Sequence, residues 1–182
     1  RAAFSFKNQG LGHPILIGRE AQVEATMELM GVPAGSLEII NARLSDNNPV
    51  YTDMLYARLQ REGYLKRDVQ RLVNQDRNIF GSCMLKNGDA DGMVTGVTRN
   101  YDVALKDAMM VLKPIPGQAV IGMSMVINRG KTVFIADTSV TELPQGPELA
   151  NIAIEAARAV SSFGFTPRVA FLSYSTFGNP MG

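Results

Sequence analysis

The chain has 182 residues, of which 46% are hydrophobic and 19% are charged. This composition is typical of a folded globular protein and argues against intrinsic disorder. The net charge of +1 gives no electrostatic basis for a nucleic-acid partner or for an anionic membrane surface. No hydrophobic run approaches the roughly 20 residues of a membrane span. Cys83 is the single cysteine, which excludes an internal disulfide and leads us to expect a cytoplasmic protein.

The first 40 residues alternate between strand and helix patterns. Residues 14–18 form a short apolar run between breakers and predict a strand, and residues 37–40 predict a second strand. Between them, a helix is predicted from Glu20 to a stop at Gly31. Arg1 reads as the interior of a helix and the C-terminal residues read as a loop, so we expect a segment of a longer protein.

Residues 52–112 are predicted to be mostly helical. One helix is expected from an N-cap at Thr52 to Gly63, a second around Val69 and Val73, and a third from Ile79 to Gly88. Residues 93–97 predict a strand, and Leu105 to Leu112 carry the pattern of another helix.

The stretch Asn-Gly-Asp-Ala-Asp-Gly-Met-Val-Thr-Gly at residues 87–96 combines two acids with three glycines. Asp and Gly disfavour a helix interior, and glycine lets the backbone approach closely either a ligand or a packed helix. The alternative is a plain turn between a helix and a strand, which spacing alone favours.

Two prolines within residues 113–117 predict a domain boundary, with a first domain at residues 1–112 and a second at 113–182. Beyond it we expect a hairpin turning at residues 128–131, a helix from Pro147 to Gly164, and a strand at residues 168–173. Strands that alternate with helices predict an α/β fold with a largely parallel sheet.

Two groups of residues suit an anionic ligand. Arg99 and Lys106 are seven residues apart and share a helix face if the helix begins early, which would suit a phosphate; solvated surface cations are the alternative. Ser175 and Thr176 follow the last predicted strand, where hydroxyls suit a phosphate or acyl oxygen; a simple Ser/Thr turn is the alternative.

Other chemistry is disfavoured. Gly130-Lys131 lacks the glycine that a P-loop needs five positions earlier, where Met125 stands. With one histidine and one cysteine, no transition-metal cluster is expected. Asp89 and Asp91 suit a hard cation in principle, but turn formation is the more frequent role. Cys83 is predicted to be a buried, inert thiol.

Four motifs, in order, resemble the phosphate acetyltransferase (phosphotransacetylase) family: residues 87–96, Lys-Pro-Ile-Pro-Gly at 113–117, Ile-Ala-Asp-Thr at 135–138, and Pro-Arg-Val-Ala-Phe-Leu-Ser-Tyr-Ser-Thr at 167–176. The variants at residues 98–106 and 174–182 are most similar to the C-terminal domain of large bacterial NADP-dependent malic enzymes. The resemblance implies a two-domain, three-layer α/β/α fold, similar to isocitrate and isopropylmalate dehydrogenases and present here as a fragment. In this fold a cleft holds the pantetheine thiol and the acyl phosphate.

The chain departs from the active members of this family at two motif positions. Lys106 stands where they carry an arginine, and lysine lacks the planar two-point grip on phosphate. Phe177 stands where they carry a lysine. The resemblance therefore implies acyl-CoA binding without turnover and no catalytic residue here, with a ligand-binding set of Asp91, Gly92, Arg99, Lys106, Ser175 and Thr176.

The function implied by this resemblance is a regulatory and oligomerisation module of an NADP-dependent malic enzyme. Acetyl-CoA would be the effector, and NADP with Mg or Mn would serve a separate malate-oxidising domain. The expected partners are a small-molecule acyl-CoA and further copies in a homo-oligomer. The alternatives are an active phosphate acetyltransferase and a scaffold that only oligomerises.

Overall fold

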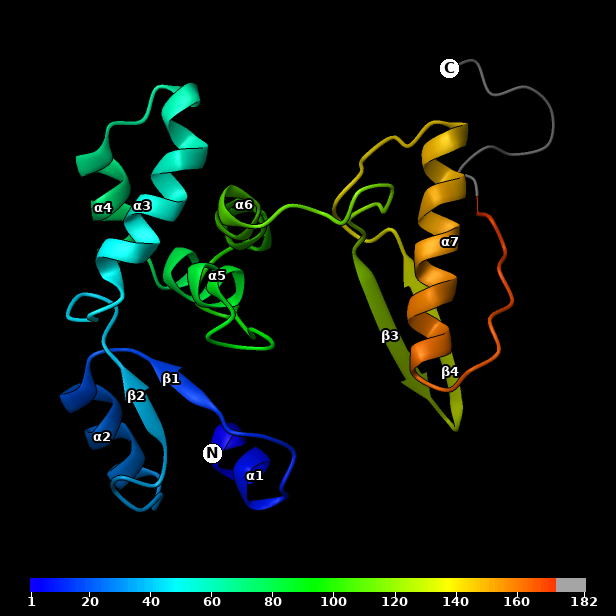
Figure 1. Ribbon diagram of the computed structural model, residues 1–182. Helices are drawn as coiled ribbons and strands as arrows, with labels where there is room; N and C mark the ends of the chain where they lie inside the picture. Colours follow the sequence, from blue (N-terminus) through cyan, green and yellow to red (C-terminus); the bar gives the residue numbers. More distant parts are fainter. Residues whose placement is uncertain (173–182) are drawn as a thin grey trace. The chain divides into compact units, whose positions relative to one another are not determined.

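The computed structural model describes residues 1–172 (Figure 1). The chain divides into two compact units, Arg1–Lys113 and Pro114–Gly182, and each is described by itself below. Compact units need not be separate domains, so the predicted organisation as two domains, 1–112 and 113–182, stays a prediction. Within residues 1–172 no helix has the length and hydrophobicity needed to cross a membrane.

The first unit begins with α1 (Ala2–Asn8), β1 (Ile15–Ile17), α2 (Glu20–Leu29) and β2 (Glu38–Ile40). β1 and β2 pair in parallel, with Leu16 opposite Ile39, and α2 makes the connection between them. Gly31 follows α2 with a φ of 67°, the left-handed conformation that glycine adopts at little cost. The two predicted strands and the helix between them are confirmed.

Five helical segments complete the first unit: α3 (Asn48–Leu59), the 3₁₀ turn η1 (Gln60–Glu62), α4 (Lys66–Gln75), α5 (Arg77–Asn87) and α6 (Tyr101–Val111). The prediction of an N-cap at Thr52 is wrong. α3 starts at Asn48, after the N-cap Asn47, with Pro49 in its first turn, and Thr52 is a buried residue inside the helix. Proline suits this position because the first turn needs no donor from its own N–H.

The core of the first unit lies between α3, α4 and α5. Tyr51 and Phe80 meet edge to face with their ring centroids 5.3 Å apart, and both side chains are 1% exposed. Cys83 is fully buried beside them, and burial raises the pKa of its thiol to about 12. The predicted buried, inert thiol is confirmed, since a thiol with this pKa carries almost no thiolate at neutral pH.

The strand predicted at residues 93–97 is absent from the described part of the chain. These residues form no ladder within residues 1–172, and Val97 has a φ of 65°, which a β-branched residue rarely adopts. The β-branched residues Val94, Thr95 and Val97 suited a strand, but no strand among the described residues pairs with them. The segment therefore lies as a loop between α5 and α6.

The second unit contains β3 (Met123–Asn128), β4 (Lys131–Ala136) and α7 (Gly146–Ser162). β3 and β4 form the predicted hairpin, and its two turn residues, Arg129 and Gly130, have φ values of 48° and 77°. Positive φ at both positions is the signature of a type I′ turn, which matches the twist of the strands. α7 packs on this hairpin (Figure 1), where Phe163 stacks on Phe134 with a centroid distance of 5.9 Å.

The sheets within residues 1–172 are smaller than the sequence predicts. One parallel and one antiparallel pair are present there, rather than one largely parallel sheet. Residues 168–172 form no strand, and residue 173, the last of that predicted strand, lies outside the described residues. Helices and strands still alternate along the chain, and the α/β class is confirmed.

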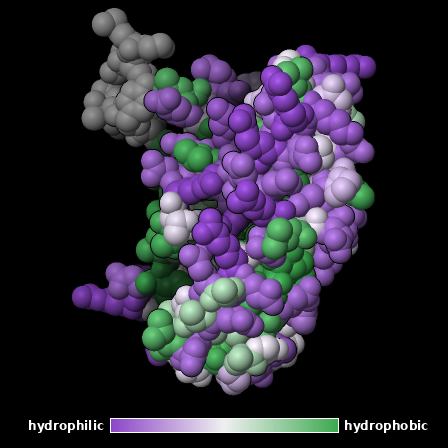
Figure 2. Space-filling view, turned by 90° about the vertical axis from the view of Figure 1, so that its left-hand side faces the viewer, coloured by the Kyte–Doolittle hydropathy of each residue, from purple (hydrophilic) through white to green (hydrophobic). Residues whose placement is uncertain are grey.

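The side of the first unit that faces the viewer in Figure 2 is mostly hydrophilic, with hydrophobic residues gathered toward the lower end of the view. This end is at the height at which Figure 1 places α1 and α2. Leu11 and Leu29, next to and within these helices, are 62% and 89% exposed. Single exposed hydrophobic residues are common on protein surfaces, so Leu11 and Leu29 do not by themselves indicate a binding site.

The core predicts the effect of truncating Phe80. Phe80→Ala is expected to lower the free energy of unfolding by about 3–5 kcal/mol, because it removes a buried ring and leaves a cavity beside Tyr51. Leu29→Ala, at an exposed position, should change it by less than about 0.5 kcal/mol. Urea unfolding of the full-length protein measures both values, and similar values for the two variants would contradict the assigned core.

Candidate functional site

The glycine-rich loop, residues 88–100, joins α5 to α6, and its start is fixed by Asp89. The backbone N–H of Asp89 donates to the carbonyl of Met84 at 2.9 Å, and Gly88 before it has a φ of 86°. The carboxylate of Asp89 accepts the hydroxyl of Tyr51 at 2.5 Å and the side-chain amide of Asn87 at 2.9 Å. The first acid of the motif therefore holds the start of the loop.

The contact between Tyr51 and Asp89 changes the pKa of both groups. The Tyr51 hydroxyl, followed by the amide of Asn87, lowers the pKa of Asp89 because both donate to the ionised form. Burial, followed by the hydrogen bond to Asp89, raises the pKa of Tyr51 to about 12. The pair is thus fixed as a neutral phenol donating to a carboxylate at neutral pH.

The end of the glycine-rich loop is fixed by Arg99. Its Nη1 lies 2.5 Å from Oδ2 of Asp76 and 2.8 Å from Oδ2 of Asp107. Asp76 also caps α5, because its Oδ1 accepts the backbone N–H groups of Asn78 and Ile79. The hydrogen bond that Arg99 donates to Asp76, with the charges of both carboxylates, raises the pKa of Arg99.

The side chain of Asn78 connects Thr95, in the middle of the loop, to Asp107 on α6. Its side-chain amide donates to Asp107 at 3.0 Å, and its carbonyl accepts the hydroxyl of Thr95 at 2.6 Å. Asn78 is 6% exposed, so these bonds form in a largely water-free place, where leaving either group unpaired would be costly. Thr95 is therefore held against the first turn of α5.

The close approach expected of a glycine occurs on α5 rather than within the loop. A Cβ added at Gly81 would lie 2.7 Å from the sulfur of Met93 and 3.2 Å from Ile17. Gly81 thus lets the glycine-rich loop pack directly on α5. For Gly88, Gly92 and Gly96 of the loop itself, an added Cβ would meet no atom within 4 Å among the described residues. The predicted close approach of these glycines to a packed helix is therefore wrong, and an approach to a ligand is not tested.

The rest of the loop is open. Val94 and Val97 are fully exposed, and within residues 1–172 the backbone N–H groups of residues 90–97 make no hydrogen bond. Free backbone donors on one short loop can bind an anion. Val97 holds a left-handed backbone, a conformation that clusters at functional sites.

The predicted ligand-binding residues lie at different places. Asp91 and Gly92 are exposed in the glycine-rich loop, and Lys106 is exposed on α6. Arg99 precedes α6, which begins at Tyr101 after the N-cap Asn100, so the helix does not start early enough for Arg99 and Lys106 to share its face. Arg99 nevertheless contacts α6 through Asp107, the residue after Lys106.

Ser175 and Thr176 lie outside the described residues. The role of all six residues in ligand binding stays a prediction.

Sequence reasoning missed the residues that organise the loop, namely Tyr51, Asp76, Asn78, Thr95 and Asp107. The role of Asp76 could have been predicted as an N-cap, because it precedes the apolar pattern that begins at Ile79 and aspartate is a favoured N-cap residue. The roles of the other four residues could not be predicted, since their partners are distant in the sequence.

The Ile-Ala-Asp-Thr motif has a structural explanation in the second unit. Burial raises the pKa of Asp137, but backbone N–H groups of Gly122, Thr141, Ser139 and Val140 outweigh it and lower the pKa. The two shortest of these bonds, from Gly122 and Thr141, are both 2.7 Å long. Asp137 therefore ties the segment before β3 to the loop after β4.

The acids of the described part do not form a metal site. Within residues 1–172, no three His, Cys, Asp or Glu side chains lie close enough together to hold a metal ion. Asp89 is instead engaged by Tyr51 and Asn87.

Removing the Tyr51 hydroxyl tests the anchor of the loop. Tyr51→Phe is expected to raise the pKa of Asp89 toward an ordinary carboxylate value and to cost about 1.5 kcal/mol of stability, because a buried donor to a charged group is lost. NMR titration of the Asp89 carboxylate measures the first effect and urea unfolding the second. Tyr101→Phe, at a half-exposed position, is the control; an Asp89 pKa unchanged in Tyr51→Phe would contradict the anchor.

The raised pKa of Tyr51 also predicts an alkaline effect on stability. The folded state holds this proton more tightly than the unfolded state, so the contribution is complete below pH 10 and is lost as the pH rises to about 12. The difference in unfolding free energy between wild type and Tyr51→Phe should shrink across this range. Urea unfolding at several pH values measures it, and a difference that stays constant would exclude the shift.

The whole chain matches a known protein family. The family model described as "Phosphate acetyl/butaryl transferase" matches residues 1–182. The chain is 52% identical over 184 residues to the NADP-dependent malic enzyme of Rhizobium meliloti (strain 1021), covering 100% of this chain and 24% of that enzyme. It is 28% identical over 182 residues to the phosphate acetyltransferase of Corynebacterium glutamicum, covering 100% of this chain and 55% of that protein.

A solved structure confirms the predicted fold class. A phosphotransacetylase from Streptococcus pyogenes superposes with a TM-score of 0.84 at 29% identity, covering 100% of this chain and 56% of that one. The chain thus spans about a quarter of the malic enzyme and about half of the phosphotransacetylases. It resembles the phosphotransacetylase-like part of NADP-dependent malic enzymes, and the chain belongs to the phosphate acetyl/butaryl transferase family.

Proposed function

We propose that this chain is the phosphotransacetylase-like module of an NADP-dependent malic enzyme and that it binds acetyl-CoA as a regulatory ligand. The observation that carries the proposal is the 52% identity to the Rhizobium meliloti malic enzyme along the entire chain. Lys106, in place of the arginine of active transferases, supports binding without turnover, because lysine keeps the charge but loses the bidentate grip on phosphate.

The glycine-rich loop supports the proposal from its geometry. Tyr51 and Asp76 hold its two ends through Asp89 and Arg99, while the backbone N–H groups of residues 90–97 are free within the described chain. Such a loop is preorganised, so binding an anionic group costs little ordering entropy. The exposed cation of Lys106 would add charge on the neighbouring helix.

The remaining parts of the proposal concern the whole protein. A separate domain would oxidise malate to pyruvate, CO₂ and NADPH, using NADP and Mg or Mn. The protein would be a cytoplasmic homo-oligomer, and acetyl-CoA would change malate turnover by binding one quaternary state more tightly than another.

Titrating acetyl-CoA into the full-length protein while malate turnover is measured tests this function. We expect acetyl-CoA to change the malate kinetics. We expect Lys106→Ala to raise the half-effective acetyl-CoA concentration about tenfold, as for the loss of one charge-assisted hydrogen bond. Lys66→Ala removes a lysine that is exposed and paired with Asp53, and it should leave that concentration unchanged.

Malate kinetics that stay unchanged at saturating acetyl-CoA would reject the regulatory function. Equal effects of Lys106→Ala and Lys66→Ala would instead reject the assigned role of Lys106.

An active phosphate acetyltransferase is the second candidate, favoured by the match to the Corynebacterium glutamicum phosphate acetyltransferase along the whole chain. Such an enzyme would transfer the acetyl group from the CoA sulfur to a phosphate oxygen. Formation of acetyl phosphate by the wild-type full-length protein at an ordinary rate would favour it over regulation. If activity is absent and appears only in Lys106→Arg combined with Phe177→Lys, the regulatory reading is supported.

A further inference from the structure

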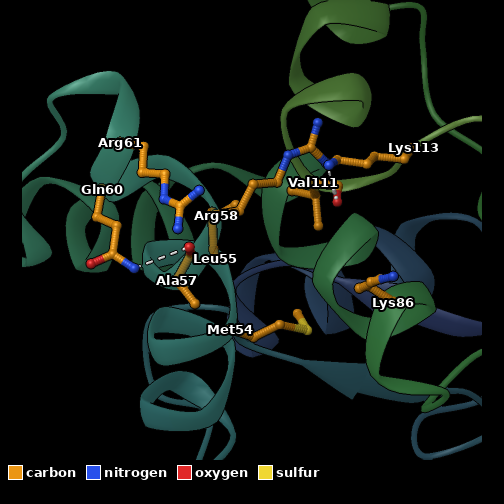
Figure 3. A pocket seen from close by; sticks show the side chains of 9 residues that line it. All are labelled: Met54, Leu55, Ala57, Arg58, Gln60, Arg61, Lys86, Val111 and Lys113. Atoms are coloured by element: carbon orange, nitrogen blue, oxygen red, sulfur yellow. Dashed lines mark hydrogen bonds between the residues drawn. The ribbon is translucent and has the colours of Figure 1, made fainter.

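A hollow of about 540 Å³ lies in the first unit, apart from the predicted ligand-binding residues (Figure 3). α3, η1, α5 and the end of α6 contribute to it. Nine residues line it: Met54, Leu55, Ala57, Arg58, Gln60, Arg61, Lys86, Val111 and Lys113. We call it the basic groove, because four of these residues are cations and none of the nine is acidic.

Arg58 is fixed at the centre of the basic groove. Its Nη1 donates to the carbonyls of Val111 at 2.7 Å and Leu112 at 3.0 Å, and its Nη2 donates to the carbonyl of Met109 at 2.8 Å. Three of its five N–H groups are thus used to cap the end of α6, and two remain. In Figure 3 this guanidinium lies between Arg61 and Lys113.

The other three cations are free to bind a ligand. Arg61, Lys86 and Lys113 are exposed, and none of them forms an ion pair within the described residues 1–172. Arg61 lies in η1, Lys86 lies in the last turn of α5, and Lys113 is the second residue after the end of α6. Because different elements carry them, the fold itself brings their charges to one hollow.

A simpler explanation is that each cation compensates a helix C-terminus. The ends of α3 with η1, of α5 and of α6 supply at most about half a negative charge each, so together about one and a half. Four cations exceed this by more than two positive charges. Helix dipoles therefore explain part of the basic charge, and the excess matches an anion with two or more negative charges.

We propose that the basic groove is a binding site for a diphosphate group, either free or as part of a nucleotide or coenzyme. Arg58 would provide a preorganised donor, and Arg61, Lys86 and Lys113 would neutralise the phosphate oxygens. The side chains of Met54, Leu55 and Val111 line the same hollow and offer apolar surface for an organic part of the ligand. This site goes beyond the proposed function, since it contains neither Lys106 nor any residue of the glycine-rich loop.

The experiment is a calorimetric titration of the full-length protein with inorganic pyrophosphate, in buffer without divalent cations. We expect saturable binding that weakens as salt increases. Arg61→Gln combined with Lys86→Gln should lower the affinity about tenfold or more, because two charge-assisted contacts are lost. Arg67→Gln is the matched control, because Arg67 is exposed on α4 and lies outside the groove.

The removed side chains are exposed, so we expect each variant to remain folded, and circular dichroism of each variant checks this. Absence of saturable binding by the wild type would overturn the proposal, as would equal affinity in the double variant and the control. A loss seen in Lys106→Ala and not in the double variant would also overturn it.

Competition identifies the source of the diphosphate. Displacement of pyrophosphate by acetyl-CoA but not by ADP would support a coenzyme ligand. Displacement by both compounds would support nucleotides in general. If neither displaces it, free diphosphate is the supported ligand. Because the probe is pyrophosphate, the site can be confirmed even if acetyl-CoA has no effect on malate turnover.

Discussion

The hydrogen bond from Tyr51 to Asp89 and the ion pairs of Arg99 with Asp76 and Asp107 hold the glycine-rich loop at both ends. Each contact joins a loop residue to a helix: Tyr51 lies on α3, Asp76 caps α5, and Asp107 lies on α6. Asp76 is central, because one carboxylate both caps α5 and binds Arg99. The exposed part of the loop can therefore keep a defined backbone without strand pairing, since its ends cannot separate without breaking bonds to charged groups.

Local signals in the sequence predicted most helices and the tight turns. Gly31 and Gly88 stop their helices with positive φ, and Arg129-Gly130 turns the hairpin as its strand pattern indicated. The failures arose where local pattern and tertiary context differ. Residues 93–97 are rich in β-branched residues, which favour a strand, but a strand requires a partner. The side chains of Met93 and Thr95 instead contact Gly81 and Asn78 on α5. Thr52 resembles a cap, yet Pro49 had already allowed α3 to begin.

The candidate site was predictable only as a location. Its glycines and acids marked the loop at residues 87–96, but the roles within it depend on contacts between distant residues. Asp89 meets Tyr51 across 38 positions, and Asn78 meets Asp107 across 29. Arg99 and Lys106 looked equivalent in the sequence, whereas in the structure one is engaged by two carboxylates and the other is exposed. The basic groove gave no sequence signal, because its four cations are spread over residues 58–113.

These contacts bear on the proposal that this chain regulates rather than catalyses. Catalysis of acyl transfer requires groups that bind the transition state more tightly than the ground state, and a planar arginine provides this for a phosphate better than a lysine. Regulation requires only that the ligand bind two states of the protein unequally. A loop fixed at Asp89 and Arg99 changes little by itself, so any such difference must come from what its exposed residues face in each state. Within residues 1–172, the backbone N–H groups of residues 90–97 make no hydrogen bond, and Asp91, Val94 and Val97 are exposed, so these parts of the loop are available for that contact.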